Sequence, residues 1–173
     1  MTAVRGAEAV VDLTAIADNV AALREHVGGR DVMAVVKADG YGHGIVEAAR
    51  AARRGGATWL GVAFLEEALA LRAAGDRGPI LSWLAVPGER YDEALEAGVE
   101  VAAYSPAQLD EIAAAGSAGR PVAVQLQLDS GLGRGGAQPA EWEGGEGESR
   151  SPAPRPPEGS PARRTAGCRS QLP

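Results

Sequence analysis

Val32-Met33-Ala34-Val35-Val36-Lys37-Ala38-Asp39-Gly40-Tyr41-Gly42-His43-Gly44 is the most informative stretch of this 173-residue sequence. Five apolar residues without a polar interruption are typical of a strand buried on both faces, as in parallel sheets. A lysine and a loop with three glycines follow, and then a helical pattern over residues 44–53 that ends in two arginines and two glycines, a helix C-terminus signal. The stretch therefore predicts a βα unit with Lys37 at the C-terminal end of its strand, where α/β proteins bind ligands.

The same alternation continues along the chain. Further strands are predicted at 58–63, 80–84, 99–103 and 121–128, and helices at 65–74, 89–97 and from Ser105-Pro106, a serine N-cap followed by proline. Before the first unit, Ala9-Val10-Val11 predicts a short strand, and Thr14 is the predicted N-cap of a helix over 15–26. The pattern predicts an α/β fold with a parallel sheet. Doubly wound sheets and the (β/α)₈ barrel both fit it, and periodicity does not choose between them.

Composition narrows the class of protein further. A net charge of −6 and a pI near 5.0 argue against nucleic acid as a partner, because phosphate binding needs a basic face. One cysteine excludes an internal disulfide, and no run approaches the roughly 20 apolar residues of a membrane span. The N-terminus lacks the apolar region of a signal peptide, so we expect a cytoplasmic protein without a membrane partner. Residues 144–173 are rich in proline, glycine and arginine, which predicts a disordered tail beside an ordered domain over 1–143.

Lys37 is the one lysine among 17 lysines and arginines. A desolvated lysine beside a loop that can approach a phosphate suits a Schiff base with pyridoxal phosphate (PLP). The N-terminus of the helix opened by His43 and Gly44 could favour that phosphate. The competing interpretation is a lysine that extends from a sheet end into solvent beside glycines that serve only a tight turn, and spacing alone gives the two about even weight.

A resemblance to a known family adds to this interpretation. Residues 35–44 resemble the PLP-attachment motif of alanine racemases. Residues 11–16 with Asn19 and Leu23-Arg24 resemble the N-terminal segment of that family, and residues 128–136 resemble its fifth-strand motif. Together the matches cover roughly residues 8–143. The resemblance implies the N-terminal PLP-binding barrel domain of a racemase, with about five of its eight βα units.

The resemblance also implies site residues and partners. Lys37 would carry PLP and serve as the base on the D-alanine face, Tyr41 would contact the cofactor phosphate, and Arg134 would lie near the cofactor and the substrate carboxylate. No metal site is expected. The implied substrate is alanine, the implied product pool supplies peptidoglycan, and the family forms homodimers in which a partner's tyrosine is the second base. Trp83 could pack on the cofactor, although a core position is as good an interpretation.

Several features depart from the family. Gln127 stands where many relatives carry a lysine that positions the arginine, and five strands fall short of the roughly 250 residues of a complete barrel. We therefore expect a fragment that does not racemise alanine alone, with a tail that could follow a frameshift or truncation. Alternatives are a non-catalytic PLP-binding module of the single-domain PLP-homeostasis type, a dinucleotide-binding domain suggested by Gly131-x-Gly133-x-x-Gly136, and a frameshifted fragment without a stable fold.

Overall fold

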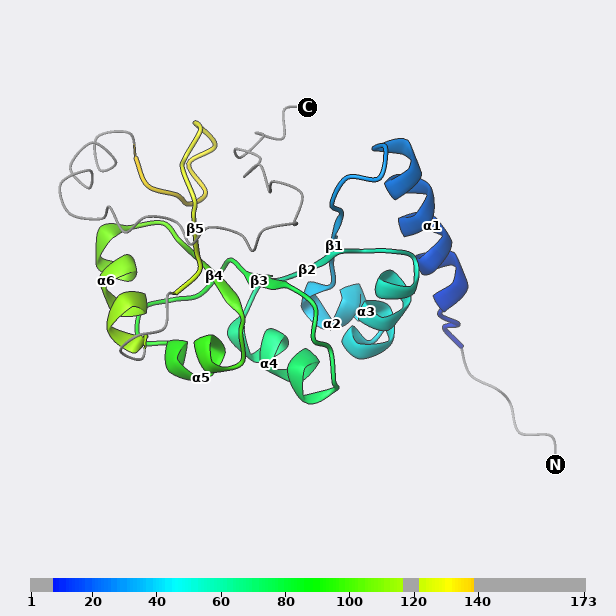
Figure 1. Cartoon of the computed structure of the whole chain (residues 1–173), viewed down its shortest axis with the longest axis horizontal. Helices are drawn as coiled ribbons and strands as arrows, with labels where there is room; N and C mark the ends of the chain where they lie inside the picture. Colours follow the sequence, from blue (N-terminus) through cyan, green and yellow to red (C-terminus); the bar gives the residue numbers. More distant parts are fainter. Residues whose placement is uncertain (1–7, 117–121, 139–173) are drawn as a thin grey trace, which may run out of the picture.

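The computed structural model describes residues 8–116 and 122–138. Within these ranges five strands alternate with helices along the chain (Figure 1). The strands are β1 (Met33–Val35), β2 (Trp59–Val62), β3 (Ile80–Ser82), β4 (Glu100–Ala103) and β5 (Val124–Leu126). The helices are α1 (Leu13–His26), α2 (Lys37–Gly42), α3 (Ile45–Arg54), α4 (Leu65–Ala73), α5 (Tyr91–Glu96) and α6 (Pro106–Ala115). Each predicted strand from residue 32 onward is confirmed, with ends one to several residues shorter.

The strand order settles which α/β architecture this is. All neighbouring strands are parallel, and the order across the sheet is β1-β2-β3-β4-β5, the same as the order along the chain. A doubly wound sheet reverses its strand order at a switch point, and no reversal occurs among the described strands. In Figure 1 the helices α3 to α6 lie along one face of the sheet. Sequential parallel strands covered on one face form an arc of a (β/α) barrel, as the resemblance implied.

The core lies between the sheet and its helices. Leu60 and Val62 of β2 are fully buried there. Because side-chain positions alternate along a strand, the position of Gly61 between them faces the opposite side of the sheet. A Cβ at Gly61 would lie 2.6 Å from the Trp83 ring and 2.9 Å from the Met33 sulfur. Glycine at this position therefore lets Trp83 lie across the sheet face away from the helices. Trp83 is half-buried in that position.

The N-terminal prediction is wrong in two details. Residues 8–12 form no strand, and Val10 is 83% exposed, because these residues lead directly into α1 and pair with no strand of the described chain. The N-cap of α1 is Asp12 and not Thr14: the Asp12 carboxylate accepts hydrogen bonds from the backbone N–H groups of Thr14 (2.9 Å) and Ala15 (3.1 Å). The Ser105 cap of α6 is confirmed, since its hydroxyl accepts from the Gln108 N–H at 3.2 Å.

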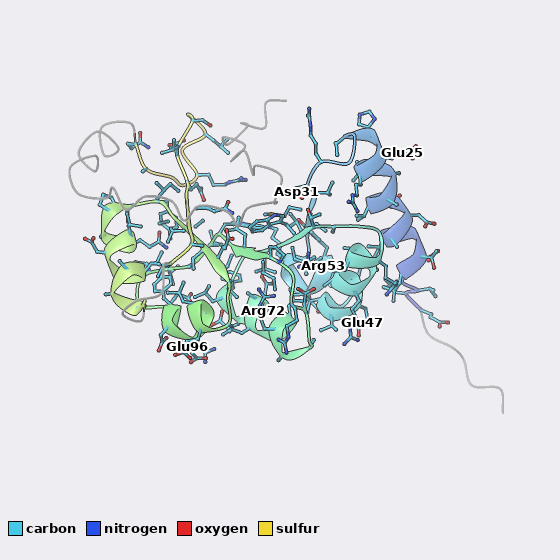
Figure 2. The ribbon with its side chains drawn as sticks, viewed as in Figure 1. Glu25, Asp31, Glu47, Arg53, Arg72 and Glu96 are labelled. Carbon is cyan, nitrogen blue, oxygen red and sulfur yellow. The ribbon has the colours of Figure 1, made fainter. Side chains whose placement is uncertain are left out.

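Two arginines join consecutive units at the N-terminal end of the strands (Figure 2). Arg53, near the end of α3, binds the Asp76 carboxylate with two nitrogens at 2.9 Å each and donates to the carbonyls of Thr58 and Pro79. Arg72, near the end of α4, donates to the carbonyls of its own loop and to Ala97 and Gly98 of the next unit. Each guanidinium thereby ties its own αβ loop to the following one.

In the described ranges no helix combines the length and apolar character needed to cross a membrane. The predicted domain boundary at residues 143 and 144 and the predicted disordered tail over 144–173 lie outside the described residues.

Candidate functional site

Lys37 lies two residues beyond β1, at the C-terminal edge of the sheet. The preceding residue continues the sheet, because the Val36 N–H donates to the Gly61 carbonyl at 2.9 Å. Lys37 is half-buried, and its Nζ lies 5.9 Å from the centroid of the Tyr41 ring. No hydrogen bond or ion pair with another described residue engages this amine. Within the described part of the chain, no carboxylate is paired with this amine.

The segment after Lys37 is a single left-handed turn. Ala38, Asp39, Gly40 and Tyr41 have φ values of 53°, 54°, 62° and 56°. Glycine adopts this conformation freely, but each residue with a Cβ costs about 1–2 kcal/mol there. Backbone bonds close the turn, from the Gly40 N–H to the Val36 carbonyl and from the Gly44 N–H to the Asp39 carbonyl, both 2.9 Å. Sequence reasoning expected a glycine loop and missed that three non-glycine residues share this conformation.

Asp39 joins the turn to α3. Its carboxylate accepts from the Ile45 N–H, the first residue of α3, at 2.8 Å. Gly40 packs against the same helix so closely that a Cβ would lie 2.9 Å from the Cβ of Ala48. The sequence pattern suggested that the N-terminus of α3 could favour a phosphate. Its first N–H, that of Ile45, binds the chain's own Asp39 carboxylate.

Glu67 of α4 ties the lysine turn to the neighbouring unit. One carboxylate oxygen accepts from the Ala38 N–H at 2.6 Å, and the other accepts from the N–H groups of Ala63 (3.0 Å) and Phe64 (3.2 Å). Glu67 was not among the predicted site residues. Its signal in the sequence is modest: an acidic residue at the third position of a helix commonly reaches back to its own N-terminus, and nothing indicates the second contact, 29 residues away.

The structure brings Tyr41 close to Lys37 but does not bring Arg134 into contact with either residue. Tyr41 is 59% exposed, on the same turn as the lysine. Arg134 is exposed in the loop that follows β5, and no hydrogen bond or ion pair joins it to another described residue. His43, also exposed, contributes only its backbone N–H, which donates to the Gly40 carbonyl at 3.2 Å.

The loop that carries Arg134 is organised around Asp129. One oxygen of its carboxylate accepts from the N–H groups of Gly131 (2.9 Å) and Gly133 (3.0 Å), and the other accepts from the Gln138 side chain (2.9 Å). The backbone N–H groups of Gly133 and Gly131 hold the pKa of the Asp129 carboxyl below its usual value. The ends of the loop meet through a bridge between Leu128 and Ala137.

This arrangement argues against the dinucleotide interpretation of Gly131-x-Gly133-x-x-Gly136. In a dinucleotide-binding loop the backbone N–H groups face a pyrophosphate. Here the N–H groups of the first two glycines face the Asp129 carboxylate instead. A Cβ at Gly136 would clash with the Asp129 backbone nitrogen, so the third glycine serves the closure of the loop.

Gln127 continues the sheet beyond β5. Its N–H donates to the Ala103 carbonyl at 2.8 Å, and its side chain is half-buried. Among residues 8–116 and 122–138, no group of three or more histidine, cysteine, aspartate or glutamate side chains is placed to hold a metal ion.

Four βα units and a fifth strand, all parallel and in sequential order, define a barrel-type α/β protein with Lys37 where its first strand ends. Comparison with known proteins identifies the family. A profile described as alanine racemase, N-terminal domain, matches residues 11–145. The chain therefore belongs to the alanine racemase N-terminal domain family, as the resemblance indicated.

Individual relatives agree with the family profile. The alanine racemase of Thermobifida fusca is 55% identical over 137 residues, which are 79% of this chain and 37% of the relative. That of Frankia casuarinae is 56% identical over 135 residues, 78% of this chain and 35% of the relative. The crystal structure of alanine racemase from D-cycloserine-producing Streptomyces lavendulae superimposes with a TM-score of 0.75 at 50% identity, over 78% of this chain and 35% of that one. The chain thus spans about a third of the length of these relatives.

Proposed function

We propose that this chain is the N-terminal, PLP-binding part of an alanine racemase and that Lys37 is the residue that binds PLP covalently. The observation that carries the proposal is the position of the chain's one lysine, at the end of β1 and beside the Tyr41 ring, in a member of this family. When bound, PLP supplies an aldehyde for a lysine amine and a ring that withdraws electrons from the Cα of an amino acid.

The donors present fit such a cofactor. The Lys37 side chain is half-buried, and no hydrogen bond or ion pair joins its amine to another described residue, so the amine is available to a cofactor aldehyde. We assign the exposed Tyr41 phenol to the cofactor phosphate and the Arg134 guanidinium to the cofactor and the substrate carboxylate. A planar, permanently charged guanidinium suits a carboxylate, and a phenol supplies one directional donor.

The proton transfer assigned to this chain is one-sided. Racemisation removes the Cα proton on one face of alanine and returns one on the other, so it needs two acid/base groups. We assign the D-alanine face to Nζ of Lys37. By analogy with the family, the second group is a tyrosine of the partner in a cytoplasmic homodimer whose product supplies peptidoglycan synthesis. We therefore expect the 173-residue chain alone to handle one face only.

Exchange of the alanine α-proton tests this proposal. The purified chain is incubated with PLP and either D- or L-alanine in D₂O, beside PLP alone as the background. We expect deuterium at the Cα of D-alanine, retention of its configuration, and loss of the exchange in Lys37→Ala. Cofactor binding without any exchange would favour the non-catalytic PLP-binding module instead. Interconversion of the two enantiomers at enzyme rates would contradict the one-sided assignment.

A further inference from the structure

We propose that Glu67 is a positioning residue for Lys37 and that it acts by holding the peptide group that follows the lysine. The inference rests on the proposed function of Lys37. Its structural basis is the 2.6 Å hydrogen bond from the Ala38 N–H to one Glu67 oxygen. The donor belongs to the peptide bond between Lys37 and Ala38, so this contact fixes the backbone from which the lysine side chain extends.

A carboxylate is the side chain that this position requires. Three backbone N–H groups, of Ala38, Ala63 and Phe64, converge on the two oxygens of Glu67. An ionised carboxylate has only acceptors, and hydrogen bonds to it are stronger than those to a neutral amide. A glutamine of the same shape would turn an NH₂ group toward at least one N–H donor and leave that donor without a partner.

The corresponding position of α6 shows the same arrangement with different chemistry. Gln108 is the third residue of α6, as Glu67 is of α4. Its side-chain oxygen accepts from the Tyr104 N–H in its own βα turn (3.1 Å), and its NH₂ donates to the Ala85 carbonyl in the preceding turn (3.0 Å). The preceding turn thus presents a carbonyl to Gln108 but an N–H to Glu67. The residue at each position matches the group that the neighbouring turn offers.

The contact has a consequence because the turn is strained. Ala38 has φ +53° and a Cβ, so it stays left-handed only while its surroundings hold it. The carboxylate of Glu67 is the side-chain partner of its N–H. Without that partner, Ala38 can relax toward the right-handed region, and the direction in which Lys37 extends changes with it. We expect this to weaken the reaction of the amine with PLP more than it weakens the fold.

The test compares Glu67→Gln with Glu66→Gln, the exposed preceding residue of the same helix. The full chain is titrated with PLP and followed by the absorbance of the protein-bound cofactor. We expect the PLP concentration at half-saturation to rise about tenfold in Glu67→Gln, the effect of one lost charged hydrogen bond, and to stay unchanged in Glu66→Gln. Hydrogen exchange at the Ala38 amide should become faster in Glu67→Gln alone.

A second substitution separates positioning from a general structural role. Glycine has no strain at φ +53°, so Ala38→Gly in the Glu67→Gln background should recover most of the lost PLP affinity. Glu67→Asp keeps a carboxylate with a shorter reach, and we expect it to fold and to bind PLP with intermediate affinity. It serves as the test variant if Glu67→Gln does not fold.

Unchanged PLP affinity in Glu67→Gln would overturn the inference, and Glu67→Asp takes its place if Glu67→Gln does not fold. An equal loss of PLP affinity in Glu66→Gln would also overturn it. So would a failure of Ala38→Gly to restore PLP affinity in the Glu67→Gln background. If the unsubstituted chain itself takes up no PLP, the proposed function fails. In that case, an unchanged rate of hydrogen exchange at the Ala38 amide in Glu67→Gln would separately contradict the proposal that Glu67 holds the turn.

Discussion

At the scale of single residues, carboxylates that accept backbone N–H groups shape both segments that carry candidate site residues. Asp39 and Glu67 bind N–H groups in and beside the lysine turn, and Asp129 binds those of the loop that carries Arg134. Each contact is charge-assisted and satisfies donors that a turn would otherwise leave to water. The acidic residues thus stabilise the backbone around the site and do not neutralise Lys37 or Arg134.

The Asp129 contacts predict a response to acid. Because the pKa of its carboxyl is lowered in the folded loop, the stabilisation is fully present above the unfolded pKa of about 3.9 and is lost as the pH falls through the lowered folded pKa. Amide exchange at Gly131 and Gly133, followed by NMR from pH 6 to pH 2, should lose its protection relative to the intrinsic exchange rate as the solution becomes acid.

Two variants check that Asp129 is the group that titrates. Asp129→Asn cannot ionise, so the extra acid-dependent exchange should disappear. Asp110→Asn, an exposed aspartate of α6, should leave it in place. Persistence of the acid response in Asp129→Asn would show that another group controls the loop.

At the scale of elements, the arginine contacts between consecutive units predict a large difference between two neighbouring residues. Arg53 binds Asp76 twice and the carbonyls of Ala57, Thr58 and Pro79 from a partly buried position. Arg53→Ala removes all of these hydrogen bonds and leaves the Asp76 carboxylate with its Arg72 and Gly78 partners. We expect the free energy of unfolding to fall by about 2–4 kcal/mol.

Arg54→Ala is the matched control. Arg54 is the next residue, is exposed, and has no hydrogen bond or ion pair with the described part of the chain, so its loss should change stability by less than about 0.5 kcal/mol. Urea unfolding of the two variants at neutral pH measures the difference. Equal effects would mean that the Arg53 contacts contribute little beyond those of a surface arginine.

Strands and helix starts were predictable from the sequence where their signals are local. The strands from residue 32 onward and the Ser105-Pro106 start of α6 were predictable, because uninterrupted apolar runs and caps are local signals. The Ala9-Val10-Val11 strand failed because three apolar residues form a strand only beside a partner strand. The left-handed Ala38, Asp39 and Tyr41 were not predictable from residue type, since contacts from α3 and α4 maintain their conformation.

At the scale of the whole molecule, strand order distinguishes the two architectures that periodicity left open. Order depends on contacts between units, so no local pattern reports it, and only the resemblance indicated a barrel beforehand. The sequence located Lys37, Tyr41 and Arg134 as candidates, and the structure joins the first two through one turn. The sequence alone could not reveal Glu67, because its hydrogen-bond partner, the Ala38 N–H, belongs to another unit of the fold.

The central claim is that Lys37 is the residue that binds PLP. The most direct measurement treats the chain with PLP and then borohydride, which fixes the bond, and locates the added mass by peptide mass spectrometry. Since the chain has one lysine, a label on a lysine side chain identifies Lys37, and the α-amino terminus serves as the comparison. We expect modification at Lys37 near one equivalent and little at the α-amino terminus. Modification at the terminus alone, or equal slow labelling of both amines, would contradict the assignment of Lys37.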